Sequence, residues 1–208
     1  MSKLRRLVLV RHGETDGNSS VRFHGSGDVD LSPAGVEQMH AVSRALGYVP
    51  VERIVASPLK RAWRAAWILS GGAPISLEDD FREIDFGRWE GMTKEEIAAS
   101  DPVLFKDWQD GAPGFEYPNG EPRARFRARV ERGLARLLEG HASAVLLVAH
   151  KGVIRTIVEK LTGQALPKEE PPIGGHLDLV RDGERWLLGT RSSNPAGLPV
   201  AAPEEVAA

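Results

Sequence analysis

Three short stretches of the chain are apolar at most positions, and a helical pattern comes after each. They cover residues 6–10, 51–56 and 144–149, and the first and last show no polar alternation. Runs of this kind are typical of strands buried on both faces of a parallel sheet. The sequence therefore predicts an α/β fold built from repeated strand–loop–helix units.

Capping residues mark the boundaries of the predicted helices. Ser32-Pro33 begins a helix that Gly47 ends, and Ser57-Pro58 is expected to cap a second helix that continues through residue 69. A capping-box signature at 93–96 predicts a helix that Asp101-Pro102 interrupts. Apolar residues at helical spacing predict two more helices, over residues 123–138 and 153–161.

The C-terminal part of the chain has a different pattern. Residues 176–181 and 184–190 flank Asp182-Gly183, a dipeptide typical of tight β-turns, so the sheet is expected to end in an antiparallel pair. Residues 194–208 are rich in Pro, Ala and Glu and are expected to form a flexible tail. With 208 residues and no long linker, residues 1–193 are interpreted as a single domain.

Composition narrows the classes of function. The 27 Lys and Arg residues against 29 Asp and Glu give a net charge of −2, so no basic field favours a nucleic-acid or membrane partner. The absence of cysteine excludes disulfides, zinc ribbons and thiolate nucleophiles. The apolar stretch at residues 7–10 is too short for a signal peptide or a membrane span, so a cytoplasmic protein is expected.

Cationic side chains follow all three predicted strands. Arg11 and His12 come directly after the first strand, Arg61 lies early in the second helix, and His150 follows the strand at 144–149. Ligands of α/β sheets bind at the carboxyl ends of parallel strands, so these side chains are expected to share one anion-binding pocket. Two arginines in bidentate geometry favour phosphate or carboxylate.

Histidines in such a pocket indicate phosphoryl transfer. A neutral imidazole can attack phosphorus and hold the phosphoryl group covalently. The second histidine, if protonated, would donate to the phosphoryl oxygens, and with the arginines it could stabilise the charge without a metal. The leaving oxygen also needs a proton donor. Glu83 is the favoured carboxylate, and spacing alone leaves Asp85 and Glu14 open.

Three other interpretations have less support. The segment at 28–32 approximates the motif of magnesium-dependent aspartyl-phosphate phosphatases, but it does not follow a buried strand. His12, Asp16 and His24 lack a recognised metal-ligand spacing, so no metal site is expected. A pocket of this kind could also bind a phosphorylated ligand without turnover, although anion binding alone would not need Glu83.

The tryptophans divide into two groups. Trp63 and Trp67 are four residues apart on the second predicted helix and are expected to pack against the sheet. Trp89 follows Gly87-Arg88 and is expected to form a wall of the substrate pocket.

Four segments of the chain resemble the histidine phosphatase superfamily, also called the phosphoglycerate-mutase-like family. Residues 9–15, LVRHGET, look like its diagnostic RHG signature. Residues 57–62, 82–87 and 148–155 resemble its second phosphate-pocket segment, its acid–base segment and its second-histidine segment. All four segments occur in the family's order, and the similarity covers residues 4–163.

The resemblance implies a three-layer α/β/α sandwich with a mostly parallel central sheet, and neither a metal nor another cofactor. It implies that His12 is the phosphorylated nucleophile and that Glu83 is the proton donor and then the base toward water. The remaining site residues that it implies are the phosphate pocket of Arg11, Arg61 and His150 and the supporting contacts Thr15 and Asn18.

Two positions depart from the family's pattern. Lys151 stands where many members have glycine, and it either adds charge beside the phosphate or points to solvent. His24 stands where mutases often have threonine and phosphatases often have glutamine. Together with Trp89, both are candidate substrate-binding residues.

Hydrolysis is favoured over mutase activity. Lys94 matches a lysine that mutases use on the substrate carboxylate. However, Lys106-Asp107 lies where mutases carry an arginine pair, and Gly17 replaces the tryptophan that usually precedes Asn18. We therefore expect a metal-independent phosphomonoester hydrolase acting on a small phosphorylated metabolite, with a cofactor-dependent phosphoglycerate mutase as the alternative.

The identity of the metabolite stays open on the sequence alone. Phosphosugars, phosphoglycerates and the cobalamin precursor ribazole phosphate are all candidates. A homodimer is the default expectation if the chain associates.

Overall fold

The computed structural model describes residues 3–47 and 50–192 of the chain. Within these residues six strands form one sheet, in the order β3-β2-β4-β1-β5-β6. The parallel strands are β1 (Arg6–Arg11), β2 (Arg53–Ala56), β3 (Ile75–Leu77) and β4 (Ala144–Ala149). The antiparallel strands at the other edge are β5 (His176–Asp182) and β6 (Arg185–Ser192).

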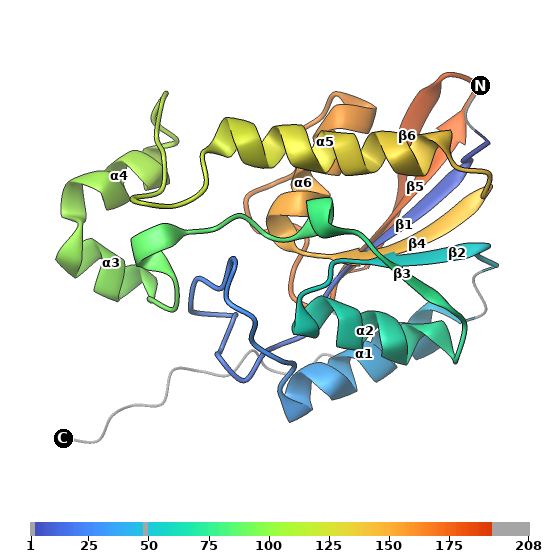
Figure 1. Cartoon of the computed structure of the whole chain (residues 1–208), viewed down its shortest axis with the longest axis horizontal. Coiled ribbons are helices and arrows are strands. Elements are labelled where there is room, and N and C mark those ends of the chain that lie inside the picture. Colours follow the sequence, from blue (N-terminus) through green and yellow to red (C-terminus); the bar gives the residue numbers. More distant parts are fainter. Residues whose placement is uncertain (1–2, 48–49, 193–208) are drawn as a thin grey trace.

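Helices cover both faces of the sheet and give three layers (Figure 1). One face carries α1 (Pro33–Leu46) and α2 (Lys60–Ser70), and the other carries α5 (Arg123–Glu139) and α6 (Lys151–Thr162). Two short 3₁₀ turns, Asp79–Phe81 and Gly87–Trp89, lie between β3 and α3. The molecule is thus an α/β/α sandwich with a mostly parallel sheet, as the sequence predicted.

Alternate residues of β1 face the two helical layers. Leu7 and Leu9 pack in the core that includes α5 and α6, whereas Val8 and Val10 pack in the core that includes α1 and α2. All four side chains are fully buried. The strand is buried on both faces, which explains why its sequence is apolar without alternation.

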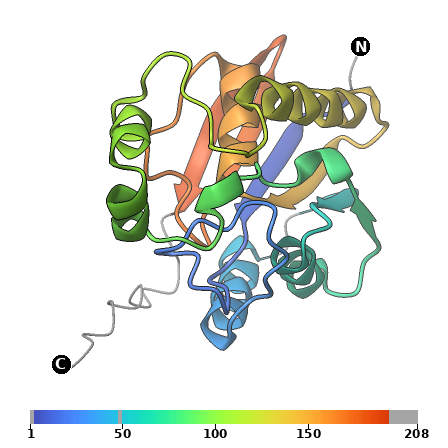
Figure 2. The same cartoon turned by 60° about the vertical axis from the view of Figure 1, so that its left-hand side comes forward.

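A small separate lobe lies to one side of the sheet. It contains α3 (Lys94–Ser100) and α4 (Pro102–Asp110), which stand apart from the helices that cover the sheet (Figure 2). Its own core contains Trp89, Ile97 and Phe115.

Several local predictions are confirmed by the hydrogen bonds that they require. Ser32 Oγ accepts a hydrogen bond from the amide of Gly35 at 3.1 Å and so caps α1. The capping box of α3 is complete, because Thr93 and Glu96 each accept a bond from the other's backbone amide. The antiparallel pair at the C-terminal edge is also present, with Gly183 in the turn at a φ of 58°.

Other local predictions differ from the structure. Ser57-Pro58 does not cap α2, which begins at Lys60 after Leu59 and has no side-chain cap. The three-residue strand β3 has no counterpart in the predicted elements, and α6 begins two residues earlier than expected. The predicted flexible tail at 194–208 lies outside the described residues. Across the described part of the chain, no helix has the length and apolarity needed to span a membrane.

Candidate active site

His12 lies at the carboxyl end of β1, where it is 4% exposed. Its Nδ1 is 2.7 Å from the carbonyl oxygen of Gly13, a geometry in which Nδ1–H donates and Nε2 keeps its lone pair. Burial, Arg61 and Arg11 hold the pKa of His12 well below its ordinary value. The side chain is therefore a neutral imidazole at neutral pH, which is the form able to attack phosphorus.

His150 faces His12 across the site. It is the residue directly before α6, and its ring centroid is 5.2 Å from that of His12 in an edge-on arrangement. The Nε2 atom lies 2.8 Å from Oγ of the buried Ser57, which follows β2. Burial and then the charge of Arg61 place the pKa of His150 well below its ordinary value.

Arg61 is a fully buried arginine in the first turn of α2. It donates to three backbone carbonyls of one loop: Gly27 at 2.6 Å, Gly25 at 2.7 Å and His24 at 3.1 Å. Burial is the main cause of a lowered pKa for Arg61, and Glu83 opposes that shift. The guanidinium therefore fixes the loop at 24–27 and carries a positive charge into the interior.

Arg11 supplies a second buried guanidinium. Its Nη1 donates to the carbonyl oxygen of Pro171 at 2.9 Å, which ties the end of β1 to the loop before β5. Burial lowers the pKa of Arg11 to about 10, so the group remains charged at neutral pH. Arg11 and Arg61 both act electrostatically on His12.

Three buried nitrogen atoms around His12 have no hydrogen-bond partner. Of the described residues, the buried side-chain polar atoms without a partner are Arg11 Nε, Arg61 Nε, His150 Nδ1 and His176 Nδ1. An unsatisfied buried polar group costs about 1–3 kcal/mol, so such atoms in a native protein call for a ligand or a water. Three nitrogens of two arginines and a histidine suit an anion with several acceptor oxygens, such as phosphate.

Glu83 is a buried carboxylate close to these cations and is 7% exposed. Its Oε2 accepts a hydrogen bond from the amide of Gly152 at 2.9 Å, and its Oε1 accepts one from Ile84 at 3.0 Å. A Cβ atom at position 152 would lie 2.4 Å from Glu83 Oε1, so only glycine lets the carboxylate approach the start of α6. Glu83 also acts electrostatically on Arg11 and Arg61.

The two rival carboxylates have other structural partners. Asp85 Oδ1 accepts a hydrogen bond from Gly87 at 2.8 Å within its own turn. Glu14 Oε1 accepts from the amide of Thr15 at 2.9 Å and from the Ser19 hydroxyl at 3.0 Å. Glu83 acts electrostatically on both Arg11 and Arg61, and Glu14 acts on Arg11, so the assignment of Glu83 as the acid–base group stays a prediction.

The supporting residues lie in the loop that follows β1. Thr15 is fully buried, and its Oγ1 accepts a bond from Ser19 at 3.2 Å within that loop. Asn18 adopts a left-handed backbone conformation with a φ of 56°. His24 Nε2 is 2.5 Å from the Gly17 carbonyl oxygen, which closes the loop upon itself. Thr15 and His24 thus have bonds that shape the loop, and their contacts to substrate stay predictions.

The tryptophans lie elsewhere than the sequence analysis expected. Trp89 is fully buried and forms no pocket wall, because its ring packs in the small lobe and its Nε1 donates to Asp101 at 2.9 Å. Trp63 and Trp67 do not pack against the sheet, since they are 43% and 62% exposed. The buried positions of α2 are instead occupied by small side chains, including those of Ala62 and Ala65.

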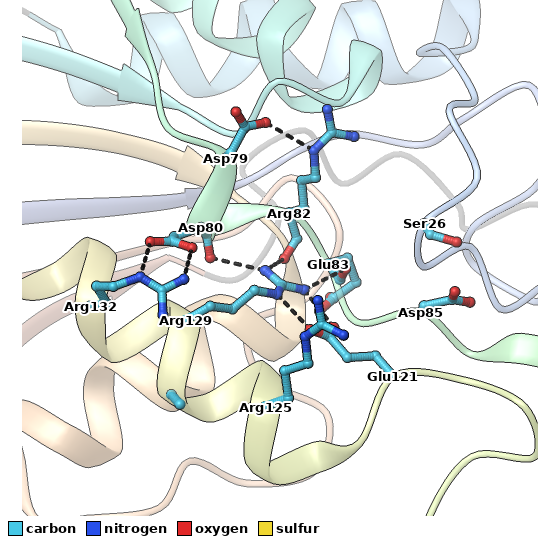
Figure 3. A pocket seen from close by; sticks show the side chains of 11 residues that line it. Ser26, Asp79, Asp80, Arg82, Glu83, Asp85, Glu121, Arg125, Arg129 and Arg132 are labelled. Atoms are coloured by element: carbon cyan, nitrogen blue, oxygen red, sulfur yellow. Dashed lines mark hydrogen bonds and ion pairs between the residues drawn. The ribbon is translucent and has the colours of Figure 1, made fainter.

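Nothing in the sequence indicates a structural role for Arg129, whose hydrogen bonds hold the backbone of Glu83; we call this arrangement the Arg129 clamp. Arg129 donates to the carbonyl oxygens of Asp80, Arg82 and Glu83 at 2.9, 2.7 and 3.0 Å. It also forms a bidentate ion pair with Glu121, in which both bonds are 2.8 Å long. These residues border a hollow of about 590 Å³, in which Arg129 reaches from α5 to the segment of Glu83 (Figure 3). No local signal in the sequence distinguishes Arg129 from the other arginines of α5.

Comparisons with known proteins identify the family of the chain. The family model described as histidine phosphatase superfamily (branch 1) matches residues 7–174. Glucosyl-3-phosphoglycerate phosphatase of Mycolicibacterium vanbaalenii is 34% identical over 183 residues, which are 83% of this chain and 80% of that protein. Adenosylcobalamin/alpha-ribazole phosphatase of Escherichia coli K12 is 32% identical over 165 residues, 76% of this chain and 79% of that protein.

A solved structure shows the same architecture. The mycobacterial glucosyl-3-phosphoglycerate phosphatase in complex with VO3 aligns with a TM-score of 0.76 at 31% identity, covering 91% of this chain and 98% of that one. The chain therefore belongs to the histidine phosphatase superfamily. Within that superfamily it is an enzyme of the phosphatase kind, similar to phosphatases of small metabolites.

Proposed function

We propose that the protein hydrolyses phosphomonoesters of small metabolites through a phosphohistidine on His12, without a metal. The three unpartnered nitrogens of Arg11, Arg61 and His150 carry this proposal, because they belong to side chains that act on or lie beside the neutral His12 imidazole and are left to bind phosphate oxygens.

The first chemical step forms a bond between His12 Nε2 and phosphorus. The bond from phosphorus to the ester oxygen breaks, and the protonated carboxyl of Glu83 gives its proton to the departing alkoxide. Arg11 and Arg61 stabilise the charge on the phosphoryl oxygens during the transfer. The hydrogen bond from Nδ1 to the Gly13 carbonyl holds the His12 ring in the required orientation.

The second step returns the enzyme to its starting state. The carboxylate of Glu83 takes a proton from a water molecule, whose oxygen attacks phosphorus while the bond to Nε2 breaks. Inorganic phosphate leaves, and His12 is again neutral. The amides of Gly152 and Ile84 keep the Glu83 carboxylate in place during both steps.

The proposal is tested by phosphate release from para-nitrophenyl phosphate in excess chelator. We expect turnover by the parent protein and its loss in His12→Ala. His40→Ala is the matched control, because His40 is an exposed histidine on α1. Rapid mixing followed by alkaline quenching and peptide mass spectrometry should detect a phosphoryl group on His12.

Three results would count against the proposal. The parent protein could show no turnover, its turnover could depend on a metal that the chelator removes, or His12→Ala could retain full activity. A phosphoryl group trapped on a residue other than His12 would overturn the assignment of the nucleophile.

A further inference from the structure

Lys151 occupies an unusual position at the edge of the site. It directly follows His150 and is the first residue of α6. The residue is half-buried, and within the described chain its ammonium group has no hydrogen bond or ion pair. Water alone satisfies such a group poorly, because burial removes part of its hydration.

The neighbours of Lys151 are mainly cationic. The charges that act on it are those of Arg11 from β1, Arg155 from α6, Lys94 from α3 and Glu169 from the loop before β5. Burial, reinforced by the nearby cations, lowers the pKa of Lys151 to about 8. Glu169 offsets only part of the positive charge that surrounds Lys151, because three cations and one carboxylate act on it.

The two neighbouring arginines both donate hydrogen bonds to backbone carbonyl oxygens. Arg155 donates to the carbonyl oxygens of Pro167 and Glu170, and Arg11 donates to that of Pro171. These bonds fasten the loop at 167–171 beside the pocket. Lys151 differs from both, because its ammonium makes no bond to the backbone of this loop and can bind a group that enters the site.

We propose that Lys151 binds a second anionic group of the substrate, so that the enzyme favours phosphomonoesters carrying a carboxylate or a second phosphate. This inference rests on the proposed function and names the class of substrate for that site. In this arrangement the phosphoryl group lies between His12 and His150, and the second anion extends toward Lys151. An anion placed there relieves the repulsion among the cations that surround Lys151.

The test compares matched substrates that differ in one anionic group. One pair is 3-phosphoglycerate and glycerol 3-phosphate, in which a carboxylate replaces a hydroxymethyl group. The other pair is fructose 1,6-bisphosphate and fructose 6-phosphate. The parent protein should have a higher kcat/KM for the more anionic member of at least one pair, by about tenfold or more, as a charge-assisted hydrogen bond provides.

Variants of Lys151 show whether this side chain is the cause. Lys151→Gln should abolish most of that ratio, mainly through KM, and Lys151→Arg should restore part of it. Lys160→Gln is the matched control, since Lys160 lies on the same helix but pairs with Glu131 at 2.8 Å on the surface. This variant should keep the parent's ratio. Thermal melts establish that each variant is folded.

Failures of the two proposals can be told apart. A parent enzyme that hydrolyses para-nitrophenyl phosphate through His12 but prefers neither anionic substrate overturns only the role of Lys151. A preference that survives in Lys151→Gln also overturns it. No hydrolysis of any of these substrates overturns both proposals.

Discussion

Removing the Arg129 guanidinium should destabilise the protein far more than removing an exposed arginine from the same helix. Arg129→Met deletes five hydrogen bonds, two to Glu121 and three to the backbone carbonyls of Asp80, Arg82 and Glu83. The Arg129 and Glu121 side chains are only 15% and 13% exposed, so water cannot fully replace the lost partner.

The size of the effect follows from the charge that is left behind. Removing one partner of a buried ion pair costs about 3–5 kcal/mol, and we expect the lower end because both groups keep some contact with solvent. For a protein of this size, about 3 kcal/mol corresponds to a fall in Tm of roughly 6–12 °C. Urea denaturation followed by circular dichroism measures the free energy of unfolding directly.

Two further variants make this prediction specific. Arg136→Met removes ion pairs with Glu78 and Asp80, but Arg136 is 45% exposed, so its loss should cost about 1 kcal/mol or less. Adding Glu121→Gln to Arg129→Met should recover part of the stability, because the unpaired carboxylate is then gone.

Activity provides a second readout of the clamp. Arg129 holds the backbone of Glu83, so Arg129→Met should lower kcat at temperatures where the variant is still folded. A loss of stability no greater than that of Arg136→Met would refute this reasoning. So would a double variant less stable than Arg129→Met alone.

Three other predictions concern the site itself. Gly152→Ala places a Cβ 2.4 Å from Glu83 Oε1 and so displaces the carboxylate. We expect kcat to fall by about tenfold or more in steady-state assays, while the Tm in thermal melts stays nearly constant. Because the pKa of His12 is depressed, its neutral form persists on acidification, and the acid limb of kcat/KM should lie below pH 6.5; a limb at higher pH contradicts this. The Lys151 ammonium loses its proton above its pKa of about 8, so the preference for the anionic substrate should decline above that pH in the parent enzyme but not in Lys151→Arg.

The prediction of the fold succeeded where the signal was local and repeated. The strands β1 and β4 are recognisable because burial on both faces requires uninterrupted apolar residues. The caps of α1 and α3 are recognisable because their partners are only three residues away. The three-residue edge strand β3 has no such signal, since its strand conformation depends on pairing with β2.

The wrong predictions concern residues whose role depends on distant partners. Ser57 was assigned to a helix cap, but its hydroxyl lies against His150, 93 positions away in the sequence. Trp89 was assigned to a pocket wall, but aromatic neighbours from α4 and the following loop enclose it. Because Trp63 and Trp67 are four residues apart, they lie on the same face of α2. That spacing does not show whether this face meets the sheet or the solvent, and in the structure it meets the solvent.

The sequence by itself determined the α/β class, the positions of the main elements and the set of residues from which a phosphate site would be built. Those features depend on local burial patterns and on the order of motifs along the chain. Only the tertiary structure decided how the amides of Gly152 and Ile84 hold the Glu83 carboxylate, which nitrogens lack partners, and that Arg129 binds the backbone of Glu83. The physical reason is that hydrogen bonding and desolvation depend on which atoms are close in the folded protein. The number of residues between two positions in the sequence does not give that distance.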